Sequence, residues 1–207
     1  APIDGGVEVY RPLGPTCGLP LWGLPSEALG AEQPTSAPFD DWVQSQCQWL
    51  LARPGPLILM GWSSGGSLAL ALAAAITRAG RTPNAVLLLD AYPPQCWQAQ
   101  PLPNRREALL NLIDVPEGFD PNPLGEEQLK HWLTRPGGSY ARLAPDALEP
   151  LIAATLAQMR HFRSWRFAPY PGPVHYLAAA LTAGPVPHQQ ALLDAVSGPI
   201  QWSSLHA

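Results

Sequence analysis

The sequence predicts a single α/β domain built on a mostly parallel sheet that is flanked by helices. Three consecutive segments carry this prediction: residues 56–60 and 85–89 are apolar runs of strand length, and residues 65–79 between them form an Ala- and Leu-rich stretch of helical length. Uniformly apolar strands joined through a helix are typical of parallel strands that are covered on both faces.

The segments before this unit give weaker signals. We expect a loop at residues 2–6, a helix near residues 7–13 and a strand over the apolar residues 18–23. Residues 39–52 are predicted to be helical because their apolar side chains recur with the period of one helix face.

Residues 97–165 have a different character. They contain no strand-like run, and Pro and Gly separate their helical segments, which we expect at residues 105–113, 126–133 and 146–162. This pattern predicts a helical insertion into an α/β core.

The α/β pattern then returns, with a strand expected at residues 174–181, a helix at 189–196 and a strand at 199–204. The core therefore comprises residues 1–96 and 166–207 of one domain that spans residues 1–207.

The composition excludes several classes of protein. With 46% hydrophobic and 14% charged residues the 207-residue chain can bury a core, and a net charge of −4 leaves no basic surface for nucleic acid. No apolar stretch is long enough for a membrane span, and no leader with a basic and then an apolar region opens the sequence, so we expect a cytoplasmic location. The cysteines Cys17, Cys47 and Cys96 have no metal-ligand spacing, and we expect free thiols and no metal.

The turn between the first apolar strand and its helix carries the strongest chemical motif. Gly61-Trp62-Ser63-Ser64-Gly65 fits the pattern G-x-S-x-G, in which a sharp turn presents a serine hydroxyl at the carboxyl edge of the sheet. The helix N-terminus lies beneath a developing oxyanion there. The pattern also occurs by chance as a glycine-rich turn, but its strand–turn–helix setting predicts Ser63 as a nucleophile, with the backbone N–H of Ser64 as an oxyanion donor.

Two further residues are expected beside this serine. Asp90 ends the next predicted strand, where a carboxylate can orient a histidine above the sheet, although an aspartate before Tyr92 and Pro93 also suits a turn. Ile3 lies in a Pro-x-x-Gly-Gly loop whose backbone N–H can supply the second oxyanion donor.

The general base must be a histidine that follows the acid on a loop after a late strand. His131 and His161 fall in the helical insertion, and His175 falls within a strand. His206 directly follows the last predicted strand and is the preferred base, whereas His188, in the loop before a helix, remains the alternative.

Several segments resemble the thioesterase domains that terminate polyketide and nonribosomal peptide synthases, which have the α/β-hydrolase fold. The resemblance spans most of the chain, and its specific part is the serine turn together with the strand that ends in Asp90. The segments that carry it are residues 2–6, 10–13, 21–24, 61–66 and 87–94.

The resemblance implies a serine hydrolase with the triad Ser63, Asp90 and His206, and a helical lid at residues 97–165. Such a thioesterase releases an acyl or peptidyl chain, by hydrolysis or cyclisation, from the phosphopantetheine of a carrier protein, as in antibiotic biosynthesis. The implied partner is the carrier protein domain, the domain itself needs no cofactor, and a homodimer is left open. A stand-alone editing thioesterase or a small-molecule serine esterase would share the triad, and a catalytically inactive binding module would lack the base.

Overall fold

The computed structural model describes residues 7–24, 38–97, 100–113, 118–138, 140–144, 146–179 and 189–205. Its centre is a sheet in which the described strands β1 (Ile58–Trp62), β2 (Ala85–Leu89), β3 (Val174–Ala179) and β4 (Ile200–Leu205) lie in that order. All three strand pairs are parallel, which confirms the predicted α/β class. No helix in the described ranges is both long enough and apolar enough to cross a membrane.

The first two strands lie close to their predicted positions. β2 coincides with residues 85–89, whereas β1 begins two residues late and continues through Gly61 to Trp62. The prediction ended the strand at Gly61, but this glycine marks a close approach, because a Cβ there would lie 2.1 Å from the Gly65 carbonyl oxygen.

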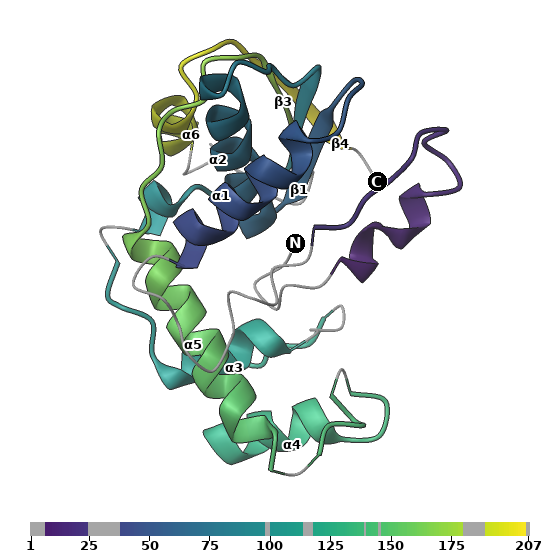
Figure 1. The fold of residues 1–207 in the computed structure, drawn as a ribbon. Coiled ribbons are helices and arrows are strands. Elements are labelled where there is room, and N and C mark those ends of the chain that lie inside the picture. The colour runs from purple at the N-terminus through teal and green to yellow at the C-terminus, as the bar shows by residue number, and fades with distance from the viewer. Residues whose placement is uncertain are drawn as a thin grey trace.

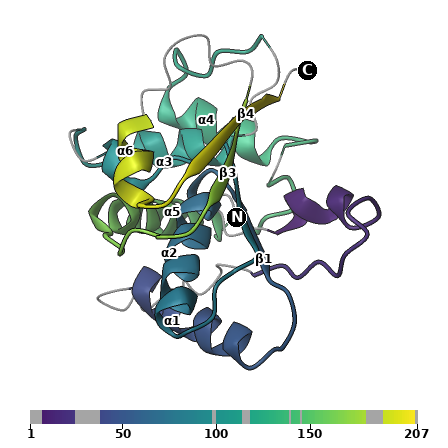
Figure 2. The ribbon, with the colours of Figure 1, turned by 90° about the horizontal axis from the view of Figure 1, so that it is seen from above.

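The helices α1 (Pro38–Leu51), α2 (Ser64–Arg78) and α6 (Gln189–Ala195) lie on the same side of the sheet (Figures 1 and 2). Burial alternates accordingly along the strands: Leu59, Val86 and Leu88 are buried, whereas Ile58 and Leu87 on the opposite face are exposed or partly exposed. The described elements thus bury one face fully, not the two that the apolar runs predicted. An apolar run predicts a strand that contributes to the core, but it does not show what covers each face.

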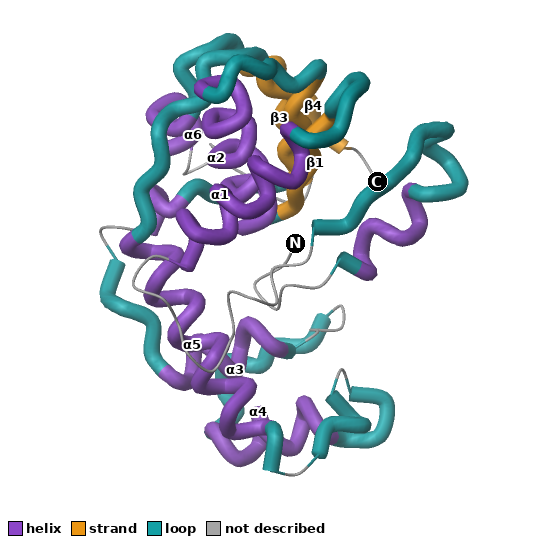
Figure 3. The backbone as a smooth tube through the Cα atoms, in the orientation of Figure 1, coloured by secondary structure: helices purple, strands orange, loops and turns teal. Residues whose placement is uncertain are grey.

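The expected strand at residues 18–23 is absent from the structure. A short 3-10 helix, η1 (Glu8–Leu13), is followed by a loop that runs through residue 24 beside the sheet (Figure 3). Leu21 and Trp22 are exposed, and no described strand pairs with this segment. The prediction was wrong because strand propensity depends on a neighbouring strand, which apolar residues alone do not provide.

The insertion forms the helices α3 (Arg105–Leu112), α4 (Glu126–Thr134) and α5 (Leu148–Ser164), each within two residues of its prediction; the short helix η3 (Pro94–Trp97) precedes them. Figure 1 shows them gathered away from the sheet. They enclose an apolar cluster separate from that of the sheet, made of Ala108, Leu109, Leu112, Ile113, Leu129, Leu133, Ile152 and Met159.

The end of α5 joins this insertion to the sheet layer. The ring of Trp165 stacks on that of Phe39 in α1 with centroids 4.9 Å apart, and its indole N–H donates to Asp40 at 2.9 Å. Phe162 meets the same Phe39 ring edge-on at 5.8 Å. One aromatic junction therefore anchors α5, while α3 and α4 depend on their own cluster.

Because the two apolar clusters are separate, we expect them to open separately. Amides of α3 and α4 should exchange with solvent faster than those of β1, β2 and α2, with the junction end of α5 intermediate. Native-state hydrogen exchange with mass spectrometry would measure this. Equal protection of α4 and β2 would show instead that the insertion and the sheet unfold as one unit.

Candidate active site

Ser63 lies on the turn between β1 and α2 in a strained backbone conformation, with φ 53° and ψ −126°. A positive φ is uncommon for residues other than glycine, and such strain concentrates at functional sites. Among the described non-glycine residues, only Ser63 and Asp90, with φ 43°, have a positive φ. The two residues chosen from the sequence as nucleophile and acid are thus the two strained ones.

Backbone hydrogen bonds hold the serine turn. The N–H of Ser63 donates to the carbonyl of Leu89 at 3.0 Å, and the N–H of Gly66 donates to the carbonyl of Ser63 at 3.0 Å. Ser64 is buried and is the first residue of α2, so its backbone N–H lies at the helix N-terminus; its role as an oxyanion donor stays a prediction. The turn is therefore fixed by α2 on one side and by β2 on the other.

Asp90 directly follows β2, and the strand register places it beside the serine. Trp62 and Leu89 are register partners, so Ser63 and Asp90 leave adjacent parallel strands at the same level. The N–H of Asp90 donates to the carbonyl of Leu177 in β3 at 2.8 Å. Asp90, the predicted acid, consequently lies at the carboxyl edge of the sheet, between β1 and β3.

The segment of residues 90–94, here the acid loop, is packed tightly against α2. A Cβ at Gly66 would lie 2.3 Å from the Cβ of Ala91, so only glycine fits at position 66 in this arrangement. The hydroxyl of Ser67 donates to the carbonyl of Tyr92 at 3.3 Å, and that of Tyr176 donates to the carbonyl of Ala91 at 3.3 Å.

The sequence reasoning assigned no role to Gly66, Ser67 or Tyr92, although all three adjoin its motifs. The phenol of Tyr92 donates to Oδ2 of Asp90 at 3.2 Å. The sequence did offer a signal for Gly66, because a second glycine directly follows the G-x-S-x-G motif. The contacts of Tyr92, by contrast, are visible only in the structure.

The other site residues predicted from the sequence, His206, His188 and Ile3, lie outside the described residues. The histidine and the second oxyanion donor stay predictions. β4 ends at Leu205, directly before His206, and Leu205 is the register partner of Ala179 at the carboxyl end of β3. His175 lies within β3, as predicted.

The thiols do not compete with Ser63. Burial raises the pKa of Cys96, the cysteine nearest in sequence to the acid loop, to about 11, so this thiol is protonated near neutral pH and is a poor nucleophile. Burial also raises the pKa of Cys47, while Cys17 is exposed on the loop after η1. Within the described part of the chain, no three His, Cys, Asp or Glu side chains are grouped so that they could hold a metal ion.

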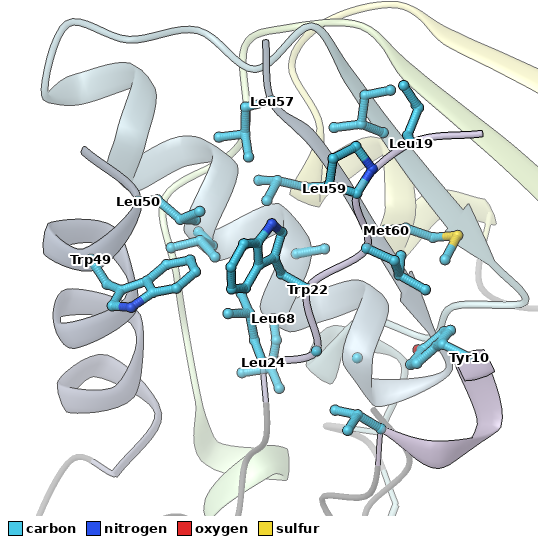
Figure 4. A pocket seen from close by; sticks show the side chains of 18 of the residues that line it. Tyr10, Leu19, Trp22, Leu24, Trp49, Leu50, Leu57, Leu59, Met60 and Leu68 are labelled. Carbon is cyan, nitrogen blue, oxygen red and sulfur yellow. The ribbon is translucent and has the colours of Figure 1, made fainter. Parts of the chain in front are cut away.

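A cavity of about 770 Å³ runs along the open edge of β1 (Figure 4). Apolar side chains line most of it, among them Trp22, Trp49 and Leu59, and Ser63 is not part of its lining. At one end the phenol of Tyr10 accepts a hydrogen bond from the N–H of Trp62 at 2.8 Å, beside the serine turn. The cavity thus borders the strand of the nucleophile but does not contain the hydroxyl.

The comparisons with known proteins agree with this geometry. The family model described as "Thioesterase domain" matches residues 3–177. The chain is 30% identical over 112 residues to a dimodular nonribosomal peptide synthase of Bacillus subtilis (strain 168), covering 53% of the chain and 5% of that synthase. It is 28% identical over 162 residues to the spectinabilin polyketide synthase system protein NorC of Streptomyces orinoci, covering 77% of the chain and 6% of NorC.

Among solved structures, the chain is similar to the NocB thioesterase domain in covalent complex with a fluorophosphonate nocardicin G analog. The TM-score is 0.67 at 20% sequence identity, over 99% of this chain and 82% of that one. At this level of identity the similarity shows the fold, which is the predicted α/β-hydrolase fold.

The packing of Gly66 against Ala91 gives a direct test of the acid loop. Gly66→Ala should destabilise the protein by about 1–3 kcal/mol, the usual cost of overpacking, because the added methyl must displace Ala91 and with it Asp90. The denaturant midpoint of unfolding would measure the loss. Gly14→Ala is the matched control, since Gly14 has φ −53° and a Cβ there would lie 3.4 Å from the carbonyl oxygen of Arg11, which is ordinary van der Waals contact. If the Gly66→Ala protein were as stable as the control, the acid loop would be able to move away from the added methyl group without a loss of stability.

Proposed function

Because the chain belongs to the thioesterase domain family, we propose that it releases an acyl or peptidyl chain from a carrier protein through an acyl-enzyme on Ser63. The observation that carries this proposal is the strained Ser63 between β1 and α2, with Asp90 at the same level of the adjacent strand. A positive φ is uncommon for residues other than glycine, and such strain concentrates at functional sites, so the strained turn supports a role for this hydroxyl.

In the first half-reaction, the hydroxyl oxygen of Ser63 attacks the thioester carbonyl. The new bond joins this oxygen to the acyl carbon, and the carbon–sulfur bond breaks. His206 takes the proton from the hydroxyl and passes it to the departing phosphopantetheine sulfur, which leaves as a thiol. Asp90 keeps the imidazole in the tautomer that accepts this proton and stabilises the imidazolium that forms.

The negative charge that develops on the carbonyl oxygen is held by the backbone N–H groups of Ser64 and Ile3 in this proposal. Ser64 supports it through its place at the start of α2, because a helix N-terminus stabilises nearby negative charge. In the second half-reaction, His206 takes a proton from water, or from a hydroxyl or amine of the chain, as that group attacks the acyl carbon. The bond between this carbon and the Ser63 oxygen then breaks, the oxygen takes the proton from His206, and an acid or a ring is released.

The helical insertion at residues 97–165 serves as the lid over this site. Support comes from its separate apolar cluster and from its start directly after the acid loop, which brings it to the edge of the sheet that carries Ser63. A segment with its own core can move relative to the sheet while the serine turn stays fixed.

The carrier-protein partner is proposed from the relatives. The two curated synthases are large proteins of which this chain spans 5% and 6% of the length. A domain that acts within such a synthase would receive its thioester from a carrier domain in the cytoplasm. An assay with a small thioester in place of the acylated carrier protein would measure the cleavage of the thioester without the contribution of this partner.

Ser63→Ala should lower turnover by roughly 10⁴–10⁶-fold, the loss typical of removing a triad nucleophile. The substrate would be an acyl thioester of N-acetylcysteamine, which mimics the end of phosphopantetheine, and intact mass spectrometry would detect the acyl adduct. Ser45→Ala, which removes an exposed hydroxyl from α1, should form the adduct at the normal rate. An adduct on the Ser63→Ala protein would overturn the assignment. No turnover and no adduct on the unaltered protein would favour the binding module.

The base is tested by a matched pair of histidine variants. His206→Ala should cost nearly as much rate as the loss of Ser63, since triad members act as a unit, whereas His188→Ala should stay within a few-fold of the unaltered protein. Both rates are measured with the same thioester, with circular dichroism to confirm folding. The opposite result would move the base to His188, and activity in both variants would exclude either histidine.

A further inference from the structure

Tyr92 is the described residue whose side chain contacts the carboxylate of Asp90. Its phenol donates to Oδ2 at 3.2 Å, a rather long hydrogen bond. One oxygen of the carboxylate is thereby engaged from within the acid loop. A catalytic aspartate needs its other oxygen for the imidazole N–H, so the choice of oxygen sets the direction of the whole triad.

The position of Tyr92 does not depend on this hydrogen bond alone. Its carbonyl accepts from the hydroxyl of Ser67 in α2, and the next residue, Pro93, is buried. Its ring lies against that of Trp97 in η3, with centroids 6.3 Å apart. The phenol is therefore a donor held in place by several other contacts, which is the condition for orienting a neighbour.

The surroundings also keep this phenol protonated. Burial raises the pKa of Tyr92 above its ordinary value of 10.0, and the negative charge of Asp90 raises it further. A tyrosine with a raised pKa remains a hydrogen-bond donor throughout the pH range in which a histidine base titrates.

We infer that Tyr92 is a positioning residue for the acid: its hydroxyl holds Oδ2 of Asp90 and leaves Oδ1 for the histidine N–H that the proposed triad requires. The inference rests on the proposed function, because it gives Tyr92 a role only if Asp90 is the triad acid. The backbone of Asp90 is fixed by its N–H, which donates to the carbonyl of Leu177, so the direction of the carboxylate is set by the contacts of the side chain. The hydrogen bond from Tyr92 also reduces the effective negative charge of the carboxylate. It therefore weakens the attraction between Asp90 and the imidazolium.

Tyr92→Phe tests this role because it keeps the ring and removes only the donor. We expect kcat to fall by about tenfold to a hundredfold, the loss typical of a hydrogen bond to a charged group, with KM little changed. Without the donor, the charge of Asp90 is more concentrated and favours the protonated imidazole. The acid limb of the pH–rate profile should therefore move to higher pH, which a merely structural role would not cause.

Tyr176→Phe is the matched control. It removes a phenol that binds the same loop, but its partner is the carbonyl of Ala91, not the carboxylate. We expect Tyr176→Phe to lower the unfolding midpoint while leaving the acid limb in place. Comparing the two variants separates the orientation of the acid from the stability of the loop.

A double-mutant cycle with Asp90→Asn completes the test. In the Asp90→Asn protein, Tyr92→Phe should add little further loss of rate, because the carboxylate that Tyr92 positions is gone. If Asp90→Asn is strongly impaired but Tyr92→Phe keeps the normal kcat and acid limb, the positioning role is overturned while the triad stands. An equal loss from Tyr92→Phe in both backgrounds would also overturn it. Normal rates in Asp90→Asn would remove Asp90 from the proposed mechanism, and the role of Tyr92 with it.

Discussion

The site depends on how closely the backbone of α2 approaches the end of β2. This approach is possible because residue 66 lacks a side chain, since a Cβ there would meet the Cβ of Ala91 at 2.3 Å. The chain must reach α2 from β1 within one residue, and Gly61 allows this by leaving room for the Gly65 carbonyl. Ser63 is the residue left between these two contacts, and its positive φ follows from them. The strain at the serine is thus a consequence of packing, which the surrounding helix and strands hold in place.

The same contact links the position of Asp90 to that of Ser63. Because Ala91 rests on Gly66, any shift of α2 moves the acid loop with it. Hydroxyl groups from α2 and β3, those of Ser67 and Tyr176, donate to successive carbonyls of this loop. Asp90 therefore has a backbone held from both sides before its side chain makes any contact. The relative position of nucleophile and acid is a property of the strand register and these loop contacts, and only the direction of the carboxylate is left to a side chain.

The sequence predicted the α/β core well where the signal was local. The unit β1–α2–β2, with Ser63 and Asp90 at its turns, could be read from apolar runs, glycines and one motif, because each depends on residues near in the chain. The strand at residues 18–23 was wrong, since pairing depends on a neighbour that these residues do not specify. Gly66 and Tyr92 were missed for a related reason. Their roles depend on Ala91 and Asp90 lying close in space, and no periodicity encodes that proximity.

The helices of the insertion and the serine turn are held together by different kinds of contact. Arg105 forms ion pairs with Glu126 and Glu149, which link α3 to α4 and α5, and Lys130 joins Glu149 at 3.1 Å. The carboxylates are exposed by 41% and 56%, so these pairs contribute little to stability and weaken further with salt. The apolar cluster between the helices supplies most of their cohesion, whereas the serine turn is held by backbone contacts that salt does not screen. Salt would therefore weaken the ion pairs between the insertion helices without acting on the backbone contacts that hold Ser63 and Asp90.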